Sequence, residues 1–274
     1  MWVGIMMELF RNLYNYREFL KTSIKKEFRG KYKKSFLGVL WSFLNPLFQL
    51  LIYAIVFPLI LKNNVDNYAV FLIVALMPWT FFNSTIVQSA ACIVNNAGIV
   101  KKVYFPREIL PISTATSNLI NFLITQIIVF AALFISGIGI GKSIIVFPII
   151  VITQYLLQLG LAFIFSAITV YIRDVEYIIN IFLMLMFYLC PIVYQPSMIP
   201  DNLLVFFKLN PMFHIISFYR TILYDKQFPR FGAVCELFLV CLVGYQEEKA
   251  AASLFPYPLC FLVFQHHELF SWHH

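Results

Sequence analysis

The sequence predicts an all-α integral membrane protein with six transmembrane helices. Of its 274 residues, 61% are hydrophobic and only 12% are charged, whereas a soluble domain carries about 45–50% apolar and about 25% charged residues. Long apolar stretches alternate with short polar links, and a helix of about 20 apolar residues crosses a bilayer. The formal net charge of +7 comes from cations beside these stretches. They indicate topology and contacts with membrane lipids, and not a nucleic-acid partner.

Residues 1–35 are predicted to form a cytoplasmic segment that contains an amphipathic helix. Over residues 8–30, apolar side chains recur every three or four positions and cations occupy the opposite face. The apolar stripe consists of Leu9, Leu13, Tyr16, Leu20, Ile24 and Phe28. Such a helix is too polar to span, so we expect it in the cytoplasmic interface with its apolar side chains in the acyl boundary.

Residues 36–245 are predicted to hold the transmembrane region. The spans cover about 36–61, 68–94, 109–136, 144–171 and 177–194, and a sixth begins near Phe231. With the N-terminus inside, 14 of the 20 Lys and Arg residues fall in inside segments, as the positive-inside rule requires. Residues 195–230 hold four cations and break the rule. Short half-inserted helices there would explain the exception.

The second span contains a polar run, which is Asn83, Ser84, Thr85, Gln88 and Ser89. Polar side chains in a span usually face the protein interior. They can serve helix packing or line a pathway, and the sequence leaves both readings open. Glu236, in the predicted last span, is similarly open between a functional group and a carboxylate that reaches the interface.

Two features that suggest chemistry are given other interpretations. Residues 136–143, SGIGIGKS, nearly match a phosphate-binding loop, but that loop must follow a strand in a soluble α/β domain. Asp174 and Glu176 lie beside Arg173, which favours ion pairing over paired-carboxylate catalysis. The five cysteines are scattered through apolar sequence without metal-ligand spacing. We therefore expect neither a catalytic site nor a metal site.

Three separated stretches resemble the membrane permeases of ABC exporters for polysaccharides, the O-antigen, capsule and teichoic-acid exporters with an ABC transmembrane type-2 domain. The first begins at Lys31 and reads KYKKSFLGVLWSFLNPLFQLLIYAIVF. The second, KKVYFPREILP from Lys101, resembles the family's cytoplasmic link between spans two and three. The third, from Pro191 to Arg220, resembles the family's re-entrant pair of short helices between spans five and six.

The resemblance implies a permease subunit that moves a lipid-linked polysaccharide across the cytoplasmic (inner) membrane of a prokaryote, with its N-terminus cytoplasmic. Two copies would pair, and two ATPase subunits would dock below them. The chain would then be no enzyme and would bind no cofactor, because ATP and magnesium belong to the ATPase. The alternatives are a type-2 permease for a drug or small lipid and a membrane-embedded transferase acting on polyprenyl lipids. The scarcity of paired carboxylates disfavours the transferase.

The resemblance also implies roles for individual residues. A coupling helix in a groove of the ATPase would comprise Lys101, Lys102, Val103, Tyr104, Phe105, Pro106, Arg107 and Glu108, and a second contact would comprise Arg173 and Asp174. The cations expected at the diphosphate of a polyprenyl-linked glycan are Lys25, Lys26, Arg29, Lys31, Lys33 and Lys34, a role that interfacial charge also favours. The expected pathway residues are Trp41, Asn45, Tyr53, Trp79, Phe82 and Tyr194.

Residues 246–274 depart from the family's pattern, which ends in a short basic tail. Here two prolines, an apolar patch and clustered histidines follow an abrupt change after Tyr245. A frameshifted or otherwise aberrant end is our hypothesis, and the other reading frames of the coding DNA beyond this point would test it.

Overall fold

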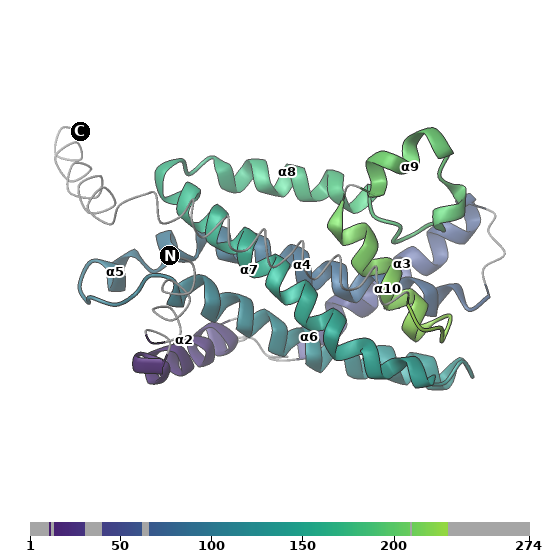
Figure 1. The fold of residues 1–274 in the computed structure, drawn as a ribbon, viewed down its shortest axis with the longest axis horizontal. Helices are drawn as coiled ribbons and strands as arrows, with labels where there is room; N and C mark the ends of the chain where they lie inside the picture. Colours follow the sequence, from purple (N-terminus) through teal and green to yellow (C-terminus); the bar gives the residue numbers. More distant parts are fainter. Residues whose placement is uncertain (1–10, 12–13, 31–39, 62–65, 209, 230–274) are drawn as a thin grey trace.

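The computed structural model consists of helices that run along one long axis (Figure 1). It describes residues 11, 14–30, 40–61, 66–208 and 210–229. The α-helices in these ranges are α2 Arg17–Gly30, α3 Trp41–Leu61, α4 Tyr68–Asn95, α5 Ala97–Val100, α6 Ile109–Ile135, α7 Phe147–Tyr171, α8 Val175–Tyr188, α9 Asp201–Lys208 and α10 Pro211–Leu223. Two 3-10 helices, η2 Lys142–Val146 and η3 Pro196–Met198, complete the order. The described ranges contain no strand, in agreement with the predicted all-α class.

Three helical segments are long and apolar enough to cross a membrane. They are Tyr68–Asn95, Ile109–Ile135 and Lys142–Tyr171, the last combining η2 with α7. Their bounds lie within a few residues of the second, third and fourth predicted spans. The length and composition of these helices indicate a multi-pass membrane protein, since a helix satisfies its own backbone groups inside the hydrocarbon.

The predicted first and fifth spans correspond to shorter apolar helices, Leu44–Phe57 within α3 and Val175–Tyr188. The fifth span was expected to reach Tyr194, but α8 ends at Tyr188. Pro191 explains the early end, because proline has no N–H and disfavours helical geometry in the residue before it. The predicted sixth span and residues 246–274 lie outside the described residues.

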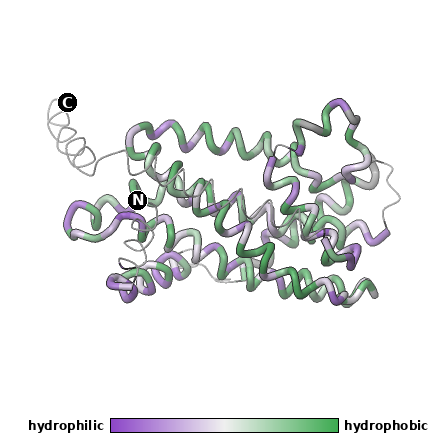
Figure 2. The backbone as a smooth tube through the Cα atoms, in the orientation of Figure 1, coloured by the Kyte–Doolittle hydropathy of each residue, from purple (hydrophilic) through white to green (hydrophobic). Residues whose placement is uncertain are grey.

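The helices give the molecule two distinct ends (Figure 1). The first, called here the α2 end, holds α2, α5, residues 101–108 and the turn between α7 and α8. The second, called the α10 end, holds α9, α10 and residues 136–141. Figure 2 shows hydrophilic residues gathered in α2 and around residues 101–108, whereas the helices between the ends are mostly hydrophobic. The links that join successive helices thus lie at alternate ends of the molecule, in the order that the sequence predicts.

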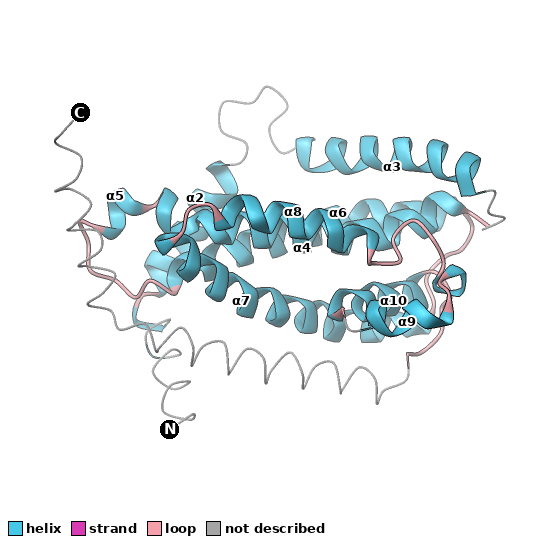
Figure 3. Cartoon of the chain, turned by 90° about the horizontal axis from the view of Figure 1, so that it is seen from above, coloured by secondary structure: helices cyan, strands magenta, loops and turns pink. Residues whose placement is uncertain are grey.

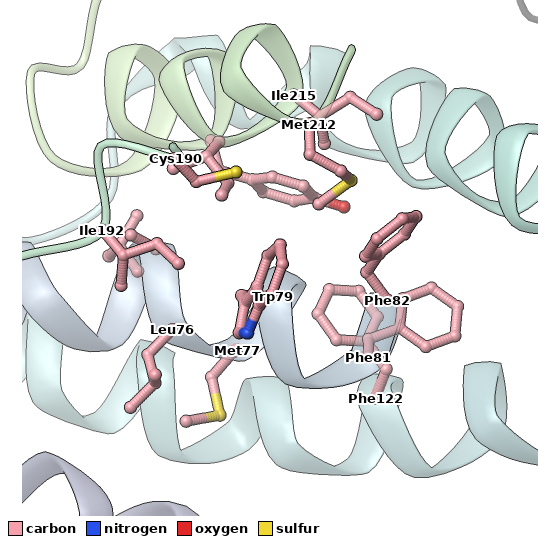
Figure 4. Close-up of a cluster of buried hydrophobic side chains, with 14 of the residues drawn as sticks. Leu76, Met77, Trp79, Phe81, Phe82, Phe122, Cys190, Ile192, Met212 and Ile215 are labelled. Atoms are coloured by element: carbon pink, nitrogen blue, oxygen red, sulfur yellow. The ribbon is translucent and has the colours of Figure 1, made fainter. Parts of the chain in front are cut away.

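Helix α4 lies at the centre of the bundle and packs against α3, α6, α7, α8 and α10. Seen from above, α3 lies on the opposite side of the α4–α6 layer from α7 and α10 (Figure 3). The apolar core joins aromatic side chains of α4 to Phe122 of α6 and to Met212 and Ile215 of α10 (Figure 4). Phe81 stacks on Phe122, with the ring centroids 4.7 Å apart.

Pro78 lies inside α4, and α7 supplies a hydrogen bond beside it. The Nε2 of Gln154 donates to the carbonyl oxygen of Pro78 at 2.8 Å. This bond ties α7 to α4 beside the position where proline removes a backbone donor from the helical ladder.

Candidate functional site

A polar cavity of about 330 Å³ lies between α3, α4 and α6. Polar side chains recur on each helix at intervals of three or four residues, so each helix presents one stripe to the cavity. Aromatic and apolar side chains fill the remaining wall. The polar lining consists of Asn45, Gln49, Thr80, Ser84, Gln88, Asn118, Asn121 and Thr125, and the aromatic lining of Trp41, Phe81 and Phe122. The described lining residues are all uncharged.

Hydrogen bonds hold several of these polar groups in place. The Nδ2 of Asn118 donates to Gln88 Oε1 at 3.3 Å and so joins α6 to α4. Ser84 Oγ donates to the carbonyl oxygen of Thr80 at 2.7 Å, and Thr80 Oγ1 donates to that of Met77 at 2.8 Å. Hydroxyl oxygens keep lone pairs after donating. The cavity can therefore accept hydrogen bonds from a hydroxylated ligand.

Two of the six predicted pathway residues line this cavity. Trp41 and Asn45 are in its wall, and Tyr53 lies one turn further along α3, where its hydroxyl accepts from Gln49 Nε2 at 3.2 Å. Trp79 and Phe82 do not line this cavity. Both are buried in the core, and Trp79 packs on Phe187 of α8 with centroids 5.7 Å apart. They occupy the face of α4 that is turned away from α3.

Tyr194 lies elsewhere, at the α10 end. Its hydroxyl donates to the carbonyl oxygen of Tyr188 at 2.8 Å, and its ring packs on Phe207 of α9. The polar run of α4 divides between the two readings left open above. Ser84 and Gln88 line the cavity, whereas Thr85 and Ser89 are fully buried away from it.

The link at the α2 end differs from the predicted coupling helix. Only the four residues of α5 are helical, and residues 101–108 form turns and extended chain. Pro106 contributes to this by removing a backbone donor. Tyr104 is 94% exposed and Val103 is 54% exposed. With Lys101 and Lys102, also exposed, they form a surface called here the link tip.

Phe105, also predicted to contact an ATPase, is instead an anchor of the fold. It is only 6% exposed, and its ring centroid lies 4.7 Å from that of Phe19 in α2. Pro106, Arg107 and Glu108 are half-buried beside it. The exposed part of the predicted contact is thus residues 101–104, because Phe105 turns into the protein.

Arg173 and Asp174 are exposed at the same end of the molecule as the link tip. They form a tight turn in which the amide of Glu176 donates to the carbonyl oxygen of Arg173 at 3.2 Å. The ion pair expected between Arg173 and its neighbours is not present among the described residues, where ion pairs join Glu18 to Arg17 and Lys21. The hydrogen bond from Lys21 lowers the pKa of the Glu18 carboxyl.

Helix α2 packs its apolar stripe on the protein. Tyr16, Phe19 and Leu20 contact the cluster formed by Phe105, Ile109 and their neighbours. The stripe therefore does not simply face the acyl boundary, as the sequence suggested, because the start of α6 offers an apolar surface to cover. Residues 9 and 13 of the stripe lie outside the described side chains.

The predicted diphosphate-binding cations have separate positions. Lys25 and Arg29 are exposed on α2. Lys26 is exposed as well, and it also reaches across to the end of α4, where its Nζ donates to Asn96 Oδ1 at 2.7 Å. Residues 31, 33 and 34, the other three predicted cations, lie outside the described residues, so their role stays a prediction.

Arg220 is a structural residue that the sequence reasoning missed. It is 5% exposed, and its Nη2 donates to the carbonyl oxygen of Ile192 at 2.6 Å. Its Nη1 reaches the carbonyl oxygen of Tyr194 at 3.4 Å, and its guanidinium lies 3.5 Å from the ring centroid of Phe71. Its place among the apolar residues of α10 was the available signal. It accounts for one of the cations that break the positive-inside rule.

The glycine-rich residues 136–143 form a link between two helices. Helix α6 precedes them, whereas a phosphate-binding loop follows a strand. Gly137 and Gly139 adopt left-handed backbone angles, with φ of 75° and 68°, which glycine accommodates without strain. Ser143 Oγ donates to the carbonyl oxygen of Ile222 at 2.8 Å and ties the loop to α10.

Comparison with known proteins identifies the family of the chain. Residues 18–224 match the family described as ABC-2 type transporter. The chain is similar to the O-antigen export system permease protein RfbA of Myxococcus xanthus, with 32% identity over 256 residues, 91% of this chain and 96% of the relative. Two proteins of the same name from Klebsiella pneumoniae are 36% identical over 196 residues, 71% of this chain and 76% of theirs. The chain therefore belongs to the ABC-2 type transporter family.

Proposed function

We propose that the chain is the permease subunit of an ATP-driven exporter that moves a lipid-linked polysaccharide across the cytoplasmic membrane. The observation that carries this proposal is the 32% identity, over 91% of the chain, to a permease named for O-antigen export. Two copies of the chain and two ATPase subunits would form the exporter. Each copy would span the membrane six times, with its N-terminus and the α2 end in the cytoplasm and α9–α10 as the re-entrant pair.

The link tip is the proposed contact with the ATPase, together with Arg173 and Asp174. Tyr104 is the proposed anchor of this contact, since exposed tyrosines are enriched among the residues that carry binding energy in protein–protein interfaces. All six residues lie at one end of the molecule. ATP and magnesium would be held by the ATPase, and the permease would receive only the movement that follows hydrolysis.

The cavity is the proposed contact with the polysaccharide. Its amide and hydroxyl groups suit a hydroxylated chain, and its aromatic rings offer flat apolar faces for sugar C–H groups. An uncharged lining gives no counter-charge to a diphosphate, so the anionic headgroup would stay at the exposed cations of α2, where each cation attracts it by about 1 kcal/mol. A drug or small apolar lipid, the alternative cargo, would leave the polar groups of the cavity unpaired.

The test is reconstitution of the permease with its ATPase in vesicles that contain a polyprenyl-diphosphate-linked glycan. Lectin accessibility of the glycan measures export. We expect export that requires ATP, the ATPase and the permease together. A complex that exports a small drug and leaves the glycan in place would overturn the proposal in favour of the alternative cargo.

The docking part of the proposal has its own test. Tyr104→Ala should weaken co-purification of the ATPase about tenfold or more, since truncation of a central interface tyrosine costs about 2 kcal/mol. Tyr14→Ala is the matched control, because Tyr14 is also an exposed tyrosine near α2. Equal binding by both variants would remove the link tip from the interface.

A further inference from the structure

Asn96 joins the membrane helix α4 to the link. Its backbone N–H donates to the carbonyl oxygens of Cys92 and Ile93, at 3.3 and 3.2 Å, and closes α4. Its own carbonyl oxygen accepts from Ile99 and Val100, at 2.9 and 3.1 Å, and opens α5. Its side-chain Nδ2 donates to the carbonyl oxygen of Cys92 at 2.8 Å. The side chain is buried, so its orientation is fixed by these contacts.

Lys26 uses the one remaining polar atom of that side chain. Its Nζ donates to Asn96 Oδ1 at 2.7 Å, across 70 positions of sequence. A hydrogen bond from a charged donor to a buried acceptor is among the stronger side-chain contacts. It ties α2 to the point where α4 becomes the link.

A second contact ties α2 to the far side of the link. The rings of Phe19 and Phe105 lie 4.7 Å apart, and Leu20 packs on the same cluster. Lys26 thus holds the start of the link and Phe19 holds its end, while Val103 and Tyr104 project between them. The position of the link tip therefore depends on the position of α2.

The outer surface of α2 carries the cations that would meet an anionic headgroup. Lys25 and Arg29 are exposed there, next to the lysine that holds Asn96. We infer that the Lys26–Asn96 hydrogen bond couples headgroup binding on α2 to the ATPase contact of the link tip, with Lys26 as a positioning residue. This inference rests on the proposed function and adds a means by which the lipid end of the cargo regulates ATP hydrolysis.

The experiment uses the full complex of permease and ATPase in phosphatidylcholine vesicles, with and without undecaprenyl diphosphate. The measured quantity is the ratio of the two ATPase rates, followed as the lipid is titrated. We expect the lipid to raise the rate of the unmodified complex. Lys26→Met should lower the maximal ratio to about one while the complex still assembles, because the headgroup still binds but no longer moves the link.

Lys25→Met is the matched variant, since it removes the same charge one residue away. It should raise the lipid concentration needed for half-maximal stimulation and leave the maximum in place. Lys26→Arg should restore part of the maximum, because a guanidinium can also donate to Asn96. Equal effects of Lys26→Met and Lys25→Met on the maximum would overturn the inference.

Variants of Asn96 change the acceptor of the Lys26 hydrogen bond and leave every cation in place. Asn96→Leu should abolish stimulation, and Lys26→Met should add nothing to it. Asn96→Asp keeps an acceptor and should retain stimulation, which separates loss of the bond from misfolding. A complex that exports glycan yet shows no lipid stimulation refutes the coupling alone. A complex that exports no glycan with any lipid refutes the proposed function.

Discussion

Replacing Arg220 with leucine should destabilise the α10 end by about 2–3 kcal/mol. The 2.6 Å bond to the carbonyl oxygen of Ile192 is worth about 1.5–3 kcal/mol, as for other hydrogen bonds to charged groups. The guanidinium over Phe71 adds up to about 2 kcal/mol when desolvated. Leucine no longer requires a buried charge, which offsets part of this loss. The bond to Tyr194, at 3.4 Å, contributes little.

Thermal unfolding in nanodiscs would measure the effect. For a domain of this size each kcal/mol shifts the midpoint by about 2–4 °C, so we expect a decrease of about 4–12 °C. A thiol-reactive dye can follow the transition, because Cys190 is buried next to the site and its Sγ accepts from Asn210 Nδ2 at 3.2 Å. Unfolding should expose this thiol earlier in the variant.

Two further variants make the experiment decisive. Lys208→Leu removes an exposed cation of the neighbouring helix α9 and should leave the midpoint within about 1 °C, as is usual for surface substitutions. Arg220→Lys should give an intermediate value, because an ammonium lacks the planar fork that reaches two carbonyls. An unchanged midpoint in Arg220→Leu would refute the idea that Arg220 holds the chain after α8.

Two other predictions concern stability in the bundle and at the link. Gln154→Leu should cost about 0.5–1.5 kcal/mol, because it removes the 2.8 Å hydrogen bond that ties α7 to the carbonyl oxygen of Pro78; a midpoint equal to that of the unmodified protein would contradict this. Phe105→Ala should cost about 3–5 kcal/mol at the α2 end and speed amide hydrogen exchange in α2, which packs on that ring. Tyr104→Ala is its control, and equal exchange in both variants would show that Phe105 does not anchor α2.

Local sequence determined the long helices well. An uninterrupted apolar run must form a helix in a membrane to satisfy its backbone, so α4, α6 and α7 lie close to their predicted positions. The end of α8 could also have been predicted from the sequence, since Pro191 marks it. The predicted span passed over this proline because the apolar composition continues beyond it.

The faces of the helices were harder to predict. In a helix that is apolar all round, aromatic side chains do not reveal which neighbour they meet. Trp79 and Phe82 were therefore assigned to a pathway although they pack in the core. Polar residues at intervals of three or four, such as Asn118, Asn121 and Thr125 in α6, would have been a better guide to the cavity.

Contacts between distant segments were beyond the reach of local pattern. Lys26 and Asn96 are each ordinary in sequence, one in a basic helix and one at a helix end, and only the fold brings them together. The same holds for Arg220 and the chain at Ile192. Charge counting treated both cations as topology signals, whereas Lys26 binds the side chain of Asn96 and Arg220 binds the backbone carbonyl of Ile192.

The short helix α8 connects the α2 end of the molecule to the α10 end. Its 14 residues rise about 1.5 Å each, which gives about 21 Å, whereas the hydrocarbon core is about 30 Å thick. Helix α8 begins directly after the turn at Arg173 and Asp174. Beyond its other end, Arg220 of α10 holds the chain through its hydrogen bond to the carbonyl oxygen of Ile192. The turn at one end of the molecule is thus joined to α10 at the other end through α8 and the chain that Arg220 holds, whereas the cavity lies between α3, α4 and α6.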